Sequence, residues 1–529
     1  MTLLRRTLIA SAAVGLLAAT LPAYADETIT ILHTNDFHSR FEPISKFDSG
    51  CSAEDNEAGE CFGGYARLVT AIADARSRNP NALLVDGGDQ FQGSLFYTYY
   101  KGKAAAEMMN ALQYDGMTVG NHEFDDGPAV LAGFMRSVGF PVLMSNGDVT
   151  KEPVLADVLK KSTVVTKGNL KIGLIGLTPE DTTELASPGK NITFSDPVKA
   201  VQAEVDRLTA EGIDKIVVLS HSGYGVDLKV AEETTGVDVI VGGHSNTLLS
   251  NTDENAKGPY PTMVGSTAVV QAYAYGKYLG ELSVTFNDEG RILEASGEPL
   301  LINGEVVEDE ATVSRVAEMA APLDEIRNQV VAVSAAPIEG NREVCRVQEC
   351  AMGNLIADAM LDRVADQGIS IALMNSGGIR ASIDEGDVTM GEVLSVLPFQ
   401  NTLSTFQITG ADVIAALENG VSQVEEVKGR FPQVAGLKFT WDPDMPANDG
   451  RIQEVMVNSD GGWTAIDPDA LYGVVSNNFV RGGGDGYKMF STNALDAYDF
   501  GPDLDVVLTE YMAAHGEHVP AVEGRIVSK

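Results

Sequence analysis

Short apolar runs alternate with helix-length segments between Thr28 and about Asn303. The runs lie at residues 28–32, 82–85, 171–175, 215–219 and 237–241. Continuous runs of this length are typical of strands that are buried on both faces of a layered α/β domain. Loops at the ends of such strands commonly carry the functional site. The pattern therefore predicts an N-terminal α/β domain with its chemistry at the strand ends.

A helical pattern follows this alternation at residues 310–331. Its apolar positions, at roughly helical spacing, are Val313, Val316, Ala317, Ala320 and Leu323. Pro322 is expected to end or kink the helix, because proline lacks the amide hydrogen that an inner turn needs. A chain of 529 residues is too long for one core. We predict an N-terminal domain at 26–309, a connector helix at 310–332 and a C-terminal domain at 333–529.

The first 25 residues have the features of an export signal. Arg5 and Arg6 precede an apolar run at residues 8–21, and Ala23-Tyr24-Ala25 forms a small-x-small cleavage pattern. A membrane anchor is disfavoured, because the run is short and many of its residues are small. The paired arginines leave both the general and the twin-arginine export routes open. The C-terminal residues show no hydrophobic tail for lipid anchoring, so we expect a soluble protein, periplasmic or secreted.

Export also bears on the cysteines, which form two close pairs: Cys51 with Cys61, and Cys345 with Cys350. An oxidising compartment favours two local disulfides. A zinc site is the alternative, but neither pair has the two-residue spacing or the nearby histidines that such sites usually show. We predict two disulfides.

The chain is strongly acidic, with a formal net charge of −38. Such a surface repels polynucleotides and anionic membranes. Any basic residue that binds a phosphate must therefore act locally.

Candidate metal ligands cluster at five predicted strand ends. They are Asp36, His38, Asp89, Asn121, His221, His244 and Asn246. Any one of these residues alone would most simply be a cap or a turn residue, but their joint occurrence in this context favours a metal centre. Two cations ~4 Å apart can activate water and neutralise the charge of a phosphate ester.

The residue types suggest how these ligands would be divided between two metal ions. Asp89 is the natural bridge, because a carboxylate has two oxygens. Asp36, His38 and Asn246 would complete one site, and Asn121, His221 and His244 the other. Mixed imidazole, carboxylate and amide ligands favour zinc, manganese, cobalt or iron over calcium.

His122 directly follows a proposed ligand, so it can lie beside the ions without binding them. Its imidazole could stabilise charge on the phosphoryl group or protonate the leaving oxygen. Asp125, three residues later, could orient that ring.

These motifs resemble those of the 5′-nucleotidase family of calcineurin-like metallophosphoesterases, over nearly the whole chain after residue 25. The motifs are Asp36-Phe37-His38, Gly87-Gly88-Asp89, the segment 120–125, His221 and the segment 242–246. The ecto-5′-nucleotidase branch is most similar, because Asn246 stands where bacterial UDP-sugar hydrolases typically place Gln. The resemblance implies a four-layered αββα metallophosphoesterase domain, a connecting helix and a C-terminal α+β nucleotide-binding domain.

The resemblance also implies substrate-binding residues in the C-terminal domain. Asn375-Ser376-Gly377-Gly378-Ile379-Arg380 is similar to an Asn-Gly-Gly-Gly-Ile-Arg motif, with Ser376 replacing one glycine. Arg346, Asn375 and Arg380 match positions that contact the phosphate and ribose side of the substrate. Phe399 and Phe479 match the pair of aromatic residues that sandwiches the base. Asp485 matches the carboxylate that binds the ribose. Arg40 matches a residue that faces a distal phosphate.

The sequence thus predicts an exported two-metal phosphohydrolase that converts nucleoside 5′-monophosphates to nucleoside and phosphate, with zinc as the first expectation. The alternative within the enzyme class is action on UDP-sugars, nucleoside di- or triphosphates or 2′,3′-cyclic nucleotides. A non-catalytic nucleoside-binding surface protein ranks far lower, because every expected ligand and His122 are present. The oligomeric state is left open.

Overall fold

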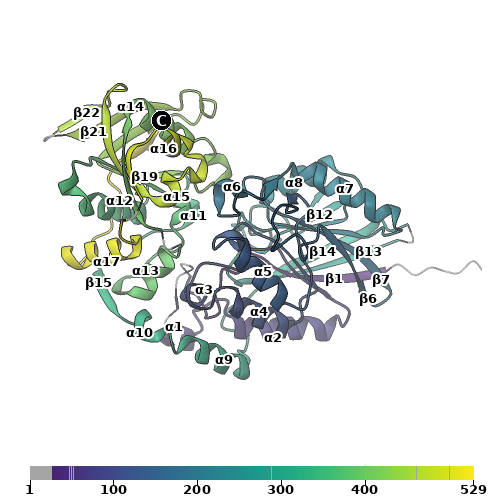
Figure 1. Ribbon diagram of the computed structural model, residues 1–529. Coiled ribbons are helices and arrows are strands. Elements are labelled where there is room, and N and C mark those ends of the chain that lie inside the picture. Colours follow the sequence, from purple (N-terminus) through teal and green to yellow (C-terminus); the bar gives the residue numbers. More distant parts are fainter. Residues whose placement is uncertain are drawn as a thin grey trace, which may run out of the picture.

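The computed structural model describes residues 27–529, except 47, 49, 52, 288, 400, 460, 461 and 500. The predicted signal at residues 1–25 lies outside the described residues. The chain forms two lobes (Figure 1), an N-terminal lobe drawn from purple to teal and a C-terminal lobe drawn from green to yellow.

Two six-stranded sheets form the centre of the N-terminal lobe. The first has the order β14 (Ile292–Leu301), β13 (Tyr278–Phe286), β1 (Glu27–Thr34), β2 (Leu83–Asp86), β3 (Gly116–Thr118) and β4 (Val142–Leu143). The second has the order β11 (Thr262–Val264), β12 (Thr267–Val270), β10 (Val239–Val241), β9 (Ile216–Ser220), β7 (Leu170–Leu177) and β6 (Ser162–Lys167). Strands β1 to β4 are mutually parallel, as are β7, β9, β10 and β12. Each of the five predicted runs overlaps one of these strands.

Alternation of side chains along the strands builds the layers. In β2, Leu83 and Val85 join the core between the two sheets, whereas Leu84 joins the core beneath the outer helices. In β9, Val217 faces the intersheet core and Val218 the opposite helical layer. This period of two is what a strand buried on both faces requires.

Helices cover both outer faces. The first sheet is covered by α2 (Tyr65–Arg78), α4 (Gly102–Leu112) and α5 (Pro128–Ser137), with α9 (Glu310–Ala320) packed against α2, and the second sheet is covered by α7 (Pro197–Ala210) and α8 (Tyr224–Glu233). Shorter elements are α1 (Ala53–Ala58), α3 (Leu95–Tyr100), α6 (Thr182–Leu185), the 3₁₀ turn η1 (His122–Phe124), β5 (Gly147–Asp148) and β8 (Thr193–Phe194). The four-layered αββα architecture is confirmed.

The connector helix is interrupted near Pro322, as expected, but its predicted extent to residue 332 is wrong. Helix α9 ends at Ala320, two residues before Pro322, and α10 covers only Asp324–Arg327. The predicted helix does not reach residue 332, because β15 (Val330–Ser334) pairs antiparallel with β17 (Gly386–Thr389). Its valine-rich sequence favours a strand. Val316 and Met319 of α9 are buried in the N-terminal core, so the connector begins as part of that lobe.

The C-terminal lobe is α+β. A five-stranded sheet has the order β19 (Pro432–Ala435), β16 (Ile371–Asn375), β23 (Leu471–Asn477), β18 (Leu403–Thr409) and β24 (Leu495–Tyr498). A four-stranded sheet has the order β22 (Gly462–Ala465), β21 (Ile452–Ser459), β20 (Leu437–Trp441) and β25 (Ile526–Ser528). Helices α12 (Ala351–Arg363) and α17 (Leu504–His515) pack on one face of the larger sheet, and α14 (Gly410–Gly420) packs on the other.

The remaining elements lie mostly in turns of this lobe. They are α11 (Arg342–Cys345), α13 (Met390–Val396), α15 (Asn478–Arg481), α16 (Lys488–Thr492), η2 (Ala365–Gln367), η3 (Ser376–Gly378), η4 (Val424–Glu426) and η5 (Gly484–Gly486). Both predicted disulfides, Cys51–Cys61 and Cys345–Cys350, are confirmed. Within the described part of the chain, none of the helices has the length and apolar character needed to cross a membrane.

Candidate active site

The strand-end residues predicted as ligands converge on one place. Asp36 and His38 follow β1, Asp89 follows β2, Asn121 follows β3, His221 follows β9, and His244 and Asn246 follow β10. Parallel strands present their carboxyl ends at the same edge, so the two sheets bring these loops together. We call these seven side chains the floor group.

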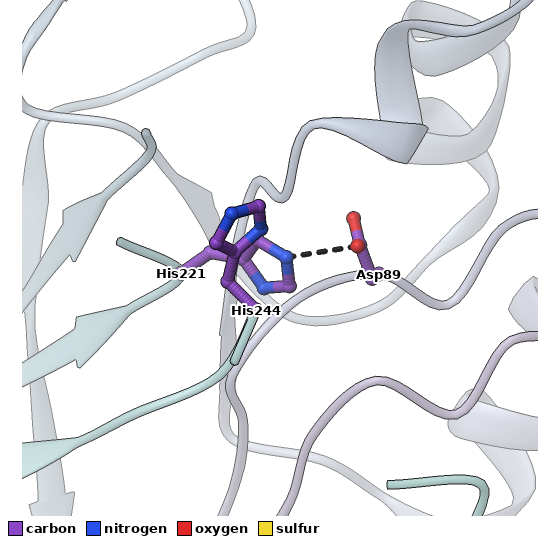
Figure 2. Close-up of side chains that lie close together, drawn as sticks. All are labelled: Asp89, His221 and His244. Carbon is purple, nitrogen blue, oxygen red and sulfur yellow. Dashed lines mark ion pairs between the residues drawn. The ribbon is translucent and has the colours of Figure 1, made fainter. Parts of the chain in front are cut away.

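Asp89 occupies the centre of the floor group. The donor atoms of Asp36, His38 and Asp89 lie within 4.8 Å of one another, and so do those of Asp89, His221 and His244. Figure 2 shows Asp89 facing His221, with His244 beside them; His221 Nε2 lies 2.8 Å from Asp89 Oδ2. One carboxylate therefore belongs to both sets of donors.

The distances within the floor group suit bound cations. His244 Nδ1 lies 3.0 Å from Asn121 Oδ1. Two donor atoms at right angles around one zinc ion, each about 2.1 Å away, would lie ~3 Å apart. Asn246 Oδ1 is buried and has no hydrogen-bond partner among the described residues. A cation would satisfy that oxygen, so the donor set fits metal ions.

Backbone carbonyls orient two of the imidazole rings. His38 Nδ1 lies 3.0 Å from the carbonyl oxygen of Phe91, and His221 Nδ1 lies 2.6 Å from that of Gly87. Each contact turns Nε2 toward the carboxylates, as is usual for metal-binding histidines. Burial alone would lower the pKa of His221, but the charges of Asp89 and Asp36 overcome this effect and raise it to about 10.

Positive backbone φ angles recur in the floor group. They are 50° at Asp36, 51° at His38, 57° at Asp89, 68° at His244 and 50° at Asn246. Residues other than glycine rarely adopt this conformation, and it persists where the surrounding structure enforces it, often at functional sites.

Glu123 is a structural carboxylate whose role the sequence analysis missed. It is fully buried and accepts hydrogen bonds from the backbone amides of Gly120 (2.7 Å), Asp89 (3.0 Å), Gln90 (2.8 Å) and Phe91 (3.2 Å). Burial, together with the charge of Asp89, raises its pKa to about 7. Glu123 thus ties the loop after β2 to the loop after β3. Its position in the Asn-His-Glu sequence was the only available signal.

His122 lies at the boundary between the lobes. Its Nδ1 is 2.7 Å from Asp125 Oδ2, and its ring stacks on Phe399 of the C-terminal lobe with centroids 5.4 Å apart. Burial opposes protonation of His122, but Asp125 and Asp89 outweigh that effect and raise its pKa. The pairing of His122 with Asp125 that the spacing suggested is present.

A cleft of about 1740 Å³ separates the two lobes. From the N-terminal lobe, the predicted residues that line it are Asn121, His122, Asp125, His244 and Asn246. From the C-terminal lobe they are Arg346, Asn375, Gly377, Gly378, Arg380, Phe399, Phe479 and Asp485, which we call the wall group. Arg40 does not line the cleft; it is buried with its guanidinium 5.4 Å from the centre of the Tyr275 ring.

Hydrogen bonds and close packing order the wall group. Asn375 Nδ2 donates to Asp485 Oδ2 (2.6 Å), and Asp485 has a φ of 52°. The Phe479 ring lies directly over Gly484, where an added Cβ would come within 2.5 Å of the ring. Glycine is therefore required at position 484 if Phe479 is to keep this position.

Cations of the C-terminal lobe reach the floor group. Arg380 Nη2 lies 3.1 Å from His38 Nε2, and Arg342 Nη1 donates to the carbonyl oxygen of His244 (3.3 Å). Lys428 Nζ lies 3.5 Å from His244 Nε2. Sequence reasoning missed Arg342 and Lys428. The four-residue spacing from Arg342 to Arg346 was a weak signal, and Lys428 gave none.

The fold and the cleft define a two-domain metallophosphoesterase. Residues 29–247 match the calcineurin-like phosphoesterase family, and residues 330–492 match the 5′-nucleotidase C-terminal domain family. The architecture is similar to the crystal structure of a 5′-nucleotidase precursor from Thermus thermophilus. That similarity has a TM-score of 0.90 and 41% identity, and it covers 95% of this chain and 99% of the other.

Curated relatives match at similar lengths. A 5′-nucleotidase of Diplobatis ommata is 37% identical over 98% of this chain and 93% of its own. The Homo sapiens 5′-nucleotidase is 36% identical over 96% of this chain and 92% of its own length. The chain belongs to the 5′-nucleotidase family and is a metal-dependent phosphomonoester hydrolase. The predicted family is confirmed, and membership implies divalent metal ions.

Proposed function

We propose that this protein is an exported enzyme that converts nucleoside 5′-monophosphates to nucleoside and inorganic phosphate with two divalent cations. The observation that carries the proposal is the position of Asp89, which belongs to both donor sets of the floor group. Its two oxygens can serve two cations at once.

The floor group divides between the two cations around Asp89. Asp36, His38 and Asn246 would hold one cation, and Asn121, His221 and His244 would hold the other. These donors suit zinc, manganese, cobalt or iron better than calcium, and zinc is the first expectation. When bound, the cations supply an activated water and neutralise charge on the phosphoryl group.

Side chains around the cations handle charge and proton transfer. His122, held by Asp125, donates to the leaving oxygen of the ester. Arg346 and Arg380 line the cleft and bind phosphate oxygens, for which the planar guanidinium group is well suited.

The remaining wall residues hold the nucleoside. Phe399 and Phe479 stack on the two faces of the base, and such stacking contributes roughly 1–3 kcal/mol per base with little preference among bases. Asp485, positioned by Asn375, accepts hydrogen bonds from the ribose hydroxyls. Arg40, behind the cleft, reaches a distal phosphate only if the neighbouring side chains move.

A phosphate-release panel tests the proposed reaction. We expect AMP to be hydrolysed faster than ADP, ATP, UDP-glucose or 2′,3′-cyclic nucleotides, with about two metal ions per chain by elemental analysis. Activity confined to cyclic nucleotides would contradict the proposal. Export is supported by the composition of residues 1–25, and N-terminal sequencing of the mature protein should start at Asp26.

A further inference from the structure

Lys428 belongs to the C-terminal lobe but lies against the floor group. It is carried by the loop between η4 and β19 and lines the interdomain cleft. Its Nζ is 3.5 Å from His244 Nε2 and 3.9 Å from Asp181 Oδ2 of the N-terminal lobe. Only 21% of its side chain is exposed.

The loop that carries Lys428 is held in a strained conformation. Val427 has a φ of 54°, which is unfavourable for a β-branched residue. Its carbonyl accepts a hydrogen bond from Arg346 Nη1 (3.5 Å), and Gly377 N donates to the carbonyl of Gly429 (2.7 Å). Two members of the wall group thus fix the backbone on either side of Lys428.

The contact between Lys428 and His244 brings two donors together. His244 Nδ1 lies 3.0 Å from Asn121 Oδ1, and a cation held by these two atoms would leave the ring hydrogen on Nε2. An ammonium group also only donates, so with the cation bound these two nitrogens cannot bond to each other. An acceptor placed within reach of both would satisfy them.

The surrounding charges indicate that this acceptor is an anion. Arg342 also contacts His244, through the carbonyl oxygen, and bound cations would add further positive charge. Asp181, the one acid that pairs with Lys428 among the described residues, is 3.9 Å away and about one third exposed. Its charge is largely screened by solvent at that exposure.

We propose that Lys428 binds an oxygen of the substrate's phosphate group, as a substrate-binding residue that the C-terminal lobe contributes to the metal centre. This inference rests on the proposed nucleotidase function. Lys428 recognises the charged phosphate, whether as ester or as inorganic product, and it contributes nothing to binding of the uncharged nucleoside.

The test replaces Lys428 with methionine, which keeps the length of the side chain but removes the charge. In metal-loaded K428M, the KM for AMP and the inhibition constant of inorganic phosphate should each rise about tenfold, the loss of one charge-assisted hydrogen bond. Binding of adenosine should not change. K229M is the matched control, since Lys229 lines the same cleft from the exposed surface of α8, and it should behave as wild type.

A second variant separates phosphate binding from a simple contact between the lobes. If Lys428 acts through Asp181, D181N should reproduce K428M; we expect D181N to keep the wild-type inhibition constant for phosphate. The inference would be overturned if K428M kept the wild-type inhibition constant for inorganic phosphate. It would also be overturned if K428M lost phosphate binding and adenosine binding equally. K428Q replaces K428M if thermal unfolding shows that the methionine variant is not folded. Absence of AMP hydrolysis by the wild-type protein would instead reject the proposed function.

Discussion

The two sides of the cleft are built by different means. The floor group is buried except for His244, which is half-buried, and its acids and imidazoles lie at the ends of parallel strands in two packed sheets. The wall group comes largely from short helices and turns of the C-terminal lobe, among them η3, α15 and η5, and presents arginines, aromatic rings and glycines. The geometry of the floor group is therefore set by the sheet topology, whereas the geometry of the wall group depends on local turns. We expect changes in the floor to remove the chemistry and changes in the wall to weaken binding.

The largest expected effect comes from the centre of the floor. Asp89→Ala removes the oxygens common to both donor sets, and kcat for AMP should fall by at least about three orders of magnitude. Adenosine binding, measured by calorimetry, should be retained because the wall is untouched. Asp126→Asn, in the same cleft, is the control and should stay within a few-fold of wild type. A D89A variant with near-normal turnover would contradict the proposed metal centre.

His122 contacts both sides of the cleft, because it follows a floor-group residue and its ring stacks on Phe399 of the wall group. His122→Ala should lower kcat about 10²–10⁴-fold if the ring serves as an acid toward the leaving oxygen. A substrate with a good leaving group, such as p-nitrophenyl phosphate, needs less protonation and should be affected less. Equal losses on both substrates would reject the acid role for His122.

Phe479 tests the wall alone. Phe479→Ala removes one stacking face, so the KM for AMP should rise about tenfold or more while kcat changes little. Ribose 5-phosphate has no base, and its hydrolysis should be insensitive to the substitution. A fall in kcat with an unchanged KM would show that the wall contributes to chemistry and would weaken the contrast.

The Cys345–Cys350 disulfide gives the smallest expected effect on activity. It closes a short turn that begins next to Arg346, so the double replacement by serine should raise the KM for AMP a few-fold. The free energy of unfolding, measured in urea, should fall by about 2 kcal/mol. This loss is small because a disulfide that closes a short loop removes little entropy from the unfolded chain. An unchanged KM would show that the turn keeps its shape without the bond.

Much of the floor could be predicted from the sequence, because strands, strand ends and ligand types are local features. The apolar runs identified parallel strands, and Asp36, Asp89 and His244 followed directly after them. Two close cysteine pairs predicted both disulfides for the same reason. Residues 330–332 were wrongly assigned to the connector helix, because the strand that pairs with them lies more than fifty residues later in the chain.

Only the tertiary structure revealed the roles of Glu123, Arg342 and Lys428. Glu123 accepts amides from two loops at once, and both cations contact His244 across the cleft between the lobes. Such contacts depend on how two lobes pack and on strained turns such as Val427, which no periodicity encodes. The amino-acid pattern determined which residues end each strand, whereas packing of the lobes decided which cations meet the floor, because that proximity arises from contacts far apart in sequence.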